Sequence, residues 1–282
     1  MCVKYYIAKV EVSDVSNESE IFVKDEISEE YFRTICNSIS FLKNIEAPKE
    51  AHRILTRNGG ELLFFLSEEN VKKTILVNKT NKDDFITEAN RLTFNFCASM
   101  RTFVDYTLIA ANRKGNAEHD DLKTMTSQIF DELPEYRFFE KLRNYIIHYS
   151  YPFGTLRKIA PDRVEFFCMK NHLLEYDAWG AIVKKDIELM PEEIDIRPYI
   201  RKVFPSLESI YLMMYYYYAE DYCNANSILA NLQKKYNLEY PVIMSENNAD
   251  NKNKIIRPFP VKKIVEGIEM LKYNPFLDIS FV

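Results

Sequence analysis

Apolar residues recur at helical spacing through the middle of the chain, and this pattern predicts a mainly α-helical protein. A long amphipathic helix is expected from Asp83 to about Arg113, because apolar residues recur there at the spacing of one helix face. Its expected inward side consists of Phe85, Ala89, Leu92, Phe96, Met100, Phe103 and Tyr106. The same spacing predicts further helices after the polar stretch 113–118, at 195–204 and at 206–236.

The start of the chain has a different pattern, which predicts a small α+β region. Strands are expected at 3–12 and 21–27, and a helix at 29–43. Two short segments flank Asn58-Gly59-Gly60, a sequence typical of tight turns, so a hairpin is expected at 52–66. His52 is then expected on the surface of that hairpin.

These patterns predict three regions along the chain. They are the α+β region at 1–80, a helical bundle at 83–236 with a short extended insertion around 153–190, and a C-terminal extension at 237–282. The extension either folds back on the body or is held by a partner chain, and the sequence leaves both open.

The segment 136–152 carries the most informative pattern. It predicts a helix whose apolar stripe is Phe138, Leu142, Tyr145, Ile146 and Tyr149. Pro134 is expected to open this helix, because proline is tolerated in the first turn. Pro152 is expected to end it by about Tyr151, because proline disfavours the α conformation in the residue before it.

Three polar residues occupy the side of this helix that faces away from the stripe. At about 100° per residue, Arg143, Asn144 and His148 fall in that sector together with Ile147. Asn144 and His148 lie one turn apart, but a straight helix does not bring Arg143 to His148. Either the helix end is distorted or a second copy of this face packs against the first. An exposed Ile147 favours the second copy.

An arginine and a histidine on one helix face suit phosphodiester chemistry. The guanidinium of Arg143 is able to bind phosphate with two hydrogen bonds. His148 is expected in the last turn, where the helix dipole favours the imidazolium, and it can exchange a proton near neutral pH. No metal ion is needed for this chemistry. On most exposed helix faces, however, such residues are simply solvated.

The string LRNYIIH at 142–148, on a helix that follows another long helix, resembles the R-N-x-x-x-H signature (R-x4-6-H) of the HEPN superfamily, the higher eukaryotes and prokaryotes nucleotide-binding domain. This resemblance implies a HEPN-like helical bundle that forms a homodimer, in which two motifs face one another across a shared cleft. Many members are metal-independent endoribonucleases that act as toxins or antiviral-defence effectors.

The resemblance also implies a role for each residue of the motif. Arg143 would bind the scissile phosphate, His148 would act as general acid/base, and Asn144 would orient the histidine or a phosphate oxygen. The implied reaction is attack by the ribose 2′-hydroxyl on the neighbouring phosphate, which requires RNA. The implied partners are RNA, a second copy of the chain and an antitoxin or other defence-system protein, without a cofactor. Some members carry a tyrosine that is modified two residues after the histidine, but this chain has Ser150 there, so that regulation is not expected.

Further substrate-binding candidates lie near the motif. In the family the preceding helix often contributes a polar residue, which makes Asn95 a candidate, although contacts within the bundle or with solvent explain it better. Lys141, Arg157 and Lys158 are candidate phosphate-binding cations, because nucleic-acid enzymes gather basic side chains. With Arg137, Arg143 and Arg163 they form a basic cluster in the sequence, for which a mixed-charge solvated surface is an equally good explanation.

Composition narrows the function and the compartment. Six glycines and the lack of either glycine-rich fingerprint argue against a nucleotide-binding phosphate loop. Five widely spaced cysteines without C-x-x-C spacing are typical of reduced thiols in the cytoplasm. No apolar stretch is long enough to span a bilayer, and the N-terminus lacks the pattern of a signal peptide, so a soluble cytoplasmic protein is expected.

Charge supports a second interpretation. The formal net charge is −5, from 37 basic and 42 acidic residues, whereas nucleic-acid enzymes are usually basic at their site. The alternative is therefore a non-catalytic HEPN-like helical scaffold that binds RNA, a nucleotide or a protein partner. His119, Asp120 and Asp121 do not change this choice, because adjacent helical residues point in different directions and seldom share a metal ion. The tyrosines at 215–218 are expected in the core rather than stacked on bases.

Overall fold

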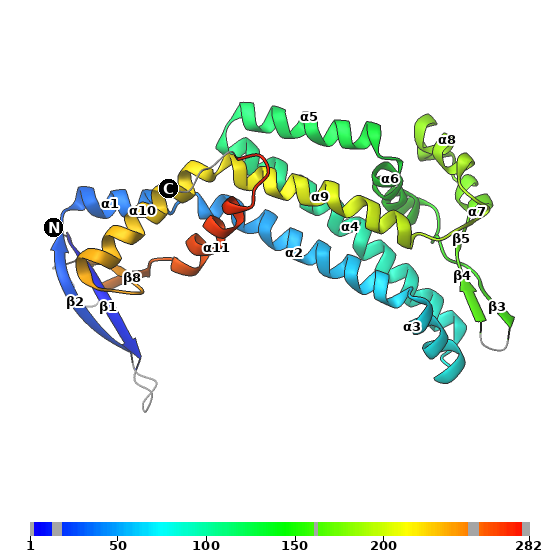
Figure 1. Cartoon of the computed structure of the whole chain (residues 1–282), viewed down its shortest axis with the longest axis horizontal. Coiled ribbons are helices and arrows are strands. Elements are labelled where there is room, and N and C mark those ends of the chain that lie inside the picture. The colour runs from blue at the N-terminus through cyan, green and yellow to red at the C-terminus, as the bar shows by residue number, and fades with distance from the viewer. Residues whose placement is uncertain (1–2, 13–18, 161–162, 248–253, 278–282) are drawn as a thin grey trace. The chain divides into compact units, whose positions relative to one another are not determined.

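The computed structural model describes residues 3–12, 19–160, 163–247 and 254–277. The protein is mainly helical and has a small antiparallel sheet that includes both N-terminal strands, as the sequence predicts. It divides into two units, residues 1–45 with 215–282 and residues 46–214. Figure 1 shows the elements of each unit. The expected ranges 1–80, 83–236 and 237–282 do not coincide with these units, because C-terminal strands complete the N-terminal sheet.

The first unit contains a four-stranded antiparallel sheet in the order β2-β1-β7-β8. Its strands are β1 (Val3–Val12), β2 (Ser19–Ile27), β7 (Val242–Asn247) and β8 (Lys254–Pro258). The strands predicted at 3–12 and 21–27 are thus confirmed as β1 and β2. In the register of the sheet Ile7 lies between Asp25 and Ile243, and both isoleucines are buried. The pairing of β7 with β1 was not predicted.

The helices of the first unit are α1 (Glu29–Ser38), α10 (Ala219–Tyr236) and α11 (Val261–Lys272). Ser28 caps α1 by accepting a hydrogen bond from the backbone N–H of Tyr31. Helix α11 packs closely on α10. The ring of Tyr222 on α10 lies so near Gly267 of α11 that a Cβ at Gly267 would overlap it. Residues 254–272 therefore fold back on the protein's own first unit, which was one of the two alternatives for the C-terminal extension.

The second unit is a helical bundle with short β-ladders. Its helices are α2 (Leu42–Phe65), α3 (Glu68–Lys72), α4 (Lys82–Lys114), α5 (Asn116–Glu132), α6 (Pro134–His148), α7 (Lys170–Leu174), α8 (Ala181–Leu189) and α9 (Arg197–Tyr217), with a π-helical turn at Lys73–Val77 and a 3-10 turn at Asp177–Trp179. Its strands are β3 (Leu156–Ala160), β4 (Arg163–Phe166), β5 (Cys168–Met169) and β6 (Glu193–Ile194), which pair as β3–β4 and β5–β6. In the range 153–190, where an extended insertion was expected, β3, β4 and β5 are extended, whereas α7, the 3-10 turn and α8 occupy most of 170–189.

Helix α4 is the long amphipathic helix expected at 83–113. Asn81 caps it by accepting a hydrogen bond from the backbone N–H of Asp83, and Asp83 and Asp84 in the first turn complement the helix dipole. The predicted inward residues are buried except Tyr106, whose side chain is 42% exposed. Helices α5 and α6 both contact α4 and each other, so α4 is the element around which the candidate site is built.

The prediction of a hairpin at 52–66 is wrong, because α2 continues through Asn58-Gly59-Gly60 without a turn. Gly59 serves close packing instead, since a Cβ there would lie 2.4 Å from a ring carbon of Phe204 on α9. His52 therefore lies on a helix and not on a hairpin surface. Its ring stacks on Tyr211 of α9 at 3.8 Å, and Nε2 lies 3.0 Å from Oε2 of Glu208.

The boundary expected between helices at 204 and 206 is also wrong. Helix α9 continues through Pro205, and the interruption comes at Tyr218, whose backbone N–H bonds to the carbonyl oxygen of Tyr215. Three of the four tyrosines at 215–218 are buried, as expected, and Tyr216 is 40% exposed. Among the described residues, no helix combines the length and the apolar character that crossing a membrane requires.

Candidate functional site

Helix α6 presents the motif residues at the protein surface. Pro134 opens it, as predicted, and it keeps α-helical form to His148, after which Tyr149 leaves the helix with φ −134° and ψ −73°. Asn144 and Arg143 are half-buried and His148 is exposed. None of these three side chains makes a hydrogen bond or ion pair with another residue of the described ranges. They are therefore available to a ligand.

Arg143 and His148 point in different directions from α6. Arg143 is close enough to the thiol of Cys97 on α4 to act on it electrostatically: burial raises the pKa of Cys97, and the nearby guanidinium opposes this rise. His148 lies one turn beyond Asn144 on the same face. The regular helix up to His148 lacks the distortion that would bring the arginine and the histidine together. Of the two routes to a joint site, the structure therefore does not show the first, a distorted helix end.

An aromatic cluster supports the C-terminal end of α6. The buried ring of Tyr145 stacks on Trp179 at 5.4 Å and meets Tyr176 edge-on at 5.7 Å. Trp179 is fixed in turn by a hydrogen bond from its indole N–H to the backbone oxygen of Leu173. Tyr149, expected on the apolar stripe, is 50% exposed because the helix ends one residue before it. The aromatic cluster thus holds the end of the motif helix through Tyr145.

A buried amide fixes the segment that follows the motif. The Asn90 side chain on α4 donates from Nδ2 to the backbone oxygen of Phe153 at 2.8 Å, and its Oδ1 accepts from the backbone N–H of Phe153 at 3.0 Å. Asn90 is 6% exposed. Sequence reasoning missed this residue, although a polar side chain next to the apolar stripe of α4 was the available signal. The contact sets where the chain goes after His148.

Several of the candidate cations already have carboxylate partners. Lys141 lies 3.7 Å from Glu140, and Arg157 on β3 bonds to Glu165 at 3.0 Å and to Glu193 at 2.9 Å. Lys158 and Arg163 lie on β3 and β4, and their side chains fall outside the described part of the chain. Among the described side chains, Lys141 and Arg157 are therefore not part of an unpaired basic cluster beside Arg143.

Arg137 has a structural role rather than a role in the expected basic cluster. Its side chain is buried, pairs with Asp186 of α8 through two hydrogen bonds, and donates from Nη1 to the backbone oxygens of Phe130 and Asp131. These two oxygens belong to the last turn of α5, where carbonyl groups lack helical partners. Arg137 thus joins α5, α6 and α8 and is not accessible to a phosphate group.

The structure separates Asn95 from Arg143. Asn95 lines a groove of about 540 Å³ between α2 and α4, together with small and apolar residues of both helices. Cys97, the neighbour of Arg143, lies about 160° around α4 from Asn95 at 100° per residue. Ser99 is buried and donates to the backbone oxygen of Phe96. Within one protomer Asn95 is therefore not part of the Arg143 surface.

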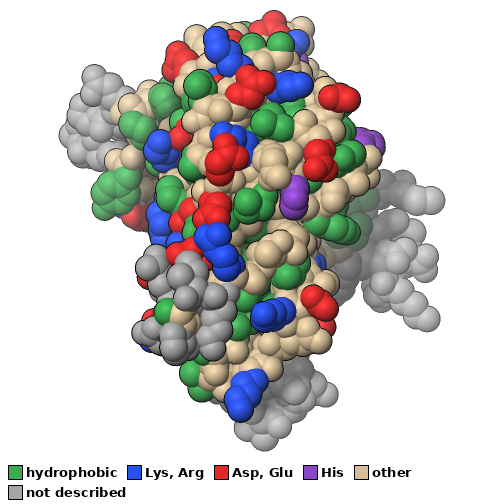
Figure 2. Space-filling view, turned by 90° about the vertical axis from the view of Figure 1, so that its right-hand side faces the viewer, with side chains coloured by type: hydrophobic (Ala, Val, Ile, Leu, Met, Phe, Trp, Pro, Cys, Tyr) green, Lys and Arg blue, Asp and Glu red, His purple; other side chains and the backbone are tan. Residues whose placement is uncertain are grey.

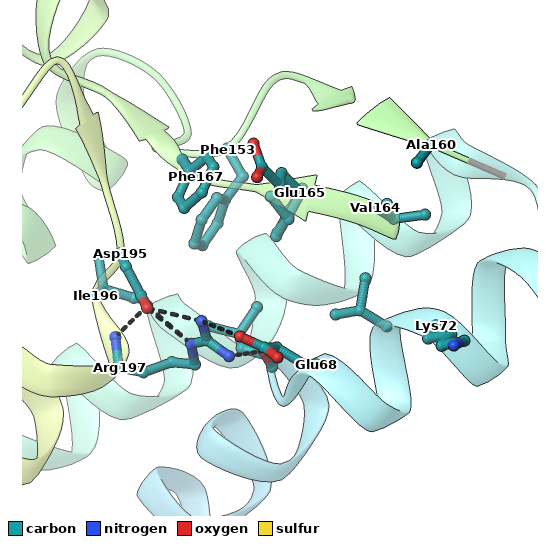
Figure 3. A pocket seen from close by; sticks show the side chains of 13 residues that line it. Glu68, Lys72, Phe153, Ala160, Val164, Glu165, Phe167, Asp195, Ile196 and Arg197 are labelled. Atoms are coloured by element: carbon teal, nitrogen blue, oxygen red, sulfur yellow. Dashed lines mark hydrogen bonds and ion pairs between the residues drawn. The ribbon is translucent and has the colours of Figure 1, made fainter. Parts of the chain in front are cut away.

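A second cavity lies beside the segment that Asn90 holds. It has a volume of about 540 Å³, and Phe153, Phe167 and Val164 form part of its apolar wall. Figure 3 shows Arg197 between Asp195 and Glu68 at one end of the cavity and Lys72 at the other. Desolvation tends to raise the pKa of Asp195, but hydrogen bonds from Arg197 outweigh it, so this pKa lies below its ordinary value. The charged groups of the cavity thus largely satisfy one another.

The surface charges around the unit are mixed. On the face shown in Figure 2, the described basic and acidic side chains are interspersed and form no continuous basic area. Within the described ranges, no three His, Cys, Asp or Glu side chains are placed to hold a metal ion, and the cysteines at 36, 97, 168 and 223 are free thiols. No significant match was found to a known protein family, to a curated protein or to a solved structure.

Proposed function

We propose that the protein is a metal-independent endoribonuclease of the HEPN type, acting as a toxin or antiviral-defence effector in the cytoplasm. The observation that carries the proposal is the surface of α6, where Arg143, Asn144 and His148 have no partner among the described residues. The protein has a net charge of −5, so acidic residues outnumber basic ones. An arginine that nevertheless has no carboxylate partner can form a favourable ion pair with a bound anion.

The proposed reaction is an internal transesterification. The ribose 2′-oxygen attacks the adjacent phosphorus, its proton passes to a general base, and the bond from phosphorus to the 5′-oxygen breaks. The leaving oxygen takes up a proton from a general acid, which leaves a 2′,3′-cyclic phosphate and a 5′-hydroxyl. Arg143 neutralises charge on the phosphate, His148 transfers protons, and Asn144 orients the imidazole or a phosphate oxygen.

The separation of Arg143 from His148 supports a homodimeric site. In one protomer a regular helix directs the two side chains apart, so one phosphate is reached by both only when a second α6 faces the first. Ile147, which lies between Asn144 and His148 in sequence, is 45% exposed and gives this face an apolar contact for a second copy.

The test is RNA cleavage by the purified full chain in the presence of EDTA. His148→Ala and Arg143→Ala are each expected to abolish cleavage while circular dichroism and the oligomeric state stay unchanged. His172→Ala is the matched control, since His172 is also exposed and lies on α7 of the same unit. An RNA with a single 2′-deoxyribose at the cleaved position is expected to resist cleavage. Cleavage that persists in His148→Ala would refute the assignment.

The pairing of basic side chains favours a second function. Arg137, Lys141 and Arg157 all lie against carboxylates, which weakens the attraction of this surface for a nucleic acid. The alternative is a non-catalytic helical scaffold that binds RNA, a nucleotide or a protein partner. Wild-type protein that binds RNA without cleaving it under any tested ionic condition would favour the scaffold.

A further inference from the structure

The residues next to His148 expose aromatic rings at the end of the motif helix. Tyr149 is 50% exposed and Tyr151 is 60% exposed. An exposed aromatic ring can stack on a planar group such as a nucleic-acid base, so the rings next to a candidate phosphate-binding residue are candidate base contacts. The two tyrosines differ in how firmly the protein holds them.

The ring of Tyr149 is held on one side and open on the other. It lies 5.5 Å from the ring of Tyr145 and 5.6 Å from the ring of Tyr176, and its hydroxyl donates to Oε2 of Glu175 at 3.3 Å. Tyr145 and Tyr176 both contact Trp179, which is buried. Tyr149 therefore rests on a fixed aromatic base and keeps half of its surface for a ligand.

Tyr151 lacks this support. No ring contact or hydrogen bond joins its side chain to another residue of the described ranges, although it is the more exposed of the two. Ordering a free side chain on binding costs conformational entropy, of the order of 0.5–1.5 kcal/mol for a side chain with many rotamers. Of the two rings, Tyr149 is the better preorganised to stack on a planar group.

We propose that Tyr149 is the stacking subsite for the base next to the scissile phosphate. This inference rests on the proposed ribonuclease function. A base reaches the face of a protein aromatic ring only when it is free of its own strand partners, which is the case in single strands, loops and bulges. Tyr149 directly follows His148 in the chain, so a base that stacks on its ring lies within reach of the proposed catalytic histidine.

The charges around Tyr149 define the path of the RNA backbone. Glu175 and Asp177 lie near the hydroxyl end of Tyr149 and raise its pKa together with desolvation, which is the largest cause. Phosphate groups are repelled from that end. The RNA backbone is therefore expected to run away from Glu175 and Asp177, while the base lies on the exposed part of the Tyr149 ring.

The experiment combines a protein variant with an RNA variant. Tyr149→Leu keeps an apolar side chain but removes the ring, and an RNA with one abasic nucleotide next to the cleaved bond removes the base. Each change alone is expected to lower kcat/KM about 5- to 100-fold, and the two together no further than either alone, because both remove the same stacking contact. Tyr149→Phe is expected to recover most of the loss, because it retains the ring. Tyr106→Leu, a change at an exposed tyrosine in the groove between α2 and α4, is the control.

A second readout does not depend on cleavage. A single-stranded oligonucleotide with 2-aminopurine at the proposed position is bound to the His148→Ala protein, and stacking on Tyr149 is expected to quench its fluorescence. The quenching is expected to disappear in His148→Ala/Tyr149→Leu and when the oligonucleotide is annealed to its complement. Thermal unfolding of each variant, followed by Trp179 fluorescence, shows that the bundle is intact.

The outcomes separate this inference from the nuclease proposal. Cleavage by wild type with equal kcat/KM for Tyr149→Leu, or additive effects of the protein and RNA changes, would overturn the subsite and leave the nuclease standing. Absence of cleavage with Tyr149-dependent quenching would overturn the nuclease and retain the stacking site. Absence of both cleavage and quenching would overturn both. Equal cleavage of paired and unpaired RNA would also count against the subsite.

Discussion

Replacing Asn90 with alanine tests how the segment after the motif is held. The change leaves the backbone N–H and the backbone oxygen of Phe153 without their partner in a buried place. An unsatisfied buried polar group costs about 1–3 kcal/mol, so two such groups give an expected loss of about 2–6 kcal/mol in the free energy of unfolding. Because this segment directly follows α6, RNA cleavage is expected to fall together with stability.

The assay is urea unfolding followed by tryptophan fluorescence. Trp179, the only tryptophan of the chain, is buried against Phe138 and Tyr145 of α6 and so reports on the motif helix itself. Asn95→Ala is the matched control, because it alters the same residue type on the same helix but removes no hydrogen bond among the described side chains. Its expected effect is within about 0.5 kcal/mol. Equal unfolding free energies for Asn90→Ala and Asn95→Ala would refute the role assigned to Asn90.

Asn90→Asp adds a pH dependence with a defined sign. An ionised carboxylate at this position accepts a hydrogen bond from the N–H of Phe153 but cannot donate one to the carbonyl oxygen of Phe153. Burial and the nearby carbonyl oxygen therefore raise the folded-state pKa of the introduced carboxyl group above its unfolded value of about 3.9. The folded state then binds more protons than the unfolded state, and stability falls as pH rises through the folded pKa. A variant whose stability relative to wild type is the same at pH 4 and pH 8 would contradict this geometry.

Three further predictions concern packing and charge in the second unit. Gly59→Ala is expected to destabilise the protein by about 1–3 kcal/mol, because the new Cβ overpacks against Phe204. Gly60→Ala is expected to stabilise it by up to about 1 kcal/mol, because there is space for a Cβ at this position. Thermal unfolding of both variants measures the difference. Asp186→Ala is expected to cost about 3–5 kcal/mol, because it leaves the buried Arg137 without its counter-ion, and urea unfolding measures it. Asp195 has a lowered folded-state pKa, so its contribution to stability is present above the unfolded pKa and is lost as pH falls through the folded pKa. In acid titrations, Asp195→Asn is therefore expected to be less stable than wild type at pH 6. The variant is also expected to lose less stability than wild type below pH 4.

The parts of the fold that the sequence predicts are those with a strong local period. Helices α4, α5 and α6 were predicted from apolar spacing and from Pro134, and strand β1 from alternation. The hairpin at Asn58-Gly59-Gly60 shows the limit of this reasoning. A pair of glycines favours a turn in an isolated segment, but here tertiary contact decides, since Phe204 fills the space that a side chain at Gly59 would take.

The candidate site, like the fold, was predicted from the sequence only in part. The position of Arg143, Asn144 and His148 on one helix follows from local spacing, whereas their surroundings depend on residues far away in the chain. Asn90 and Phe153 are 63 residues apart, and no local pattern pairs them. The exposure of Tyr149 was missed because the apolar period was extended one residue beyond the last helical residue, His148.

The distribution of ion pairs strengthens the interpretation of Arg143. Near the motif, the arginines with described side chains at 101, 137 and 157 each lie against at least one carboxylate, as expected in a protein with more acidic than basic residues. Arg143 has none among the described residues, and its electrostatic influence on the buried Cys97 opposes the rise that burial causes in the pKa of that thiol. A half-buried guanidinium without a counter-ion is unfavourable in the free protein and becomes favourable when an anion binds. Under the proposed function, pairing this charge with a phosphate would contribute to the binding energy.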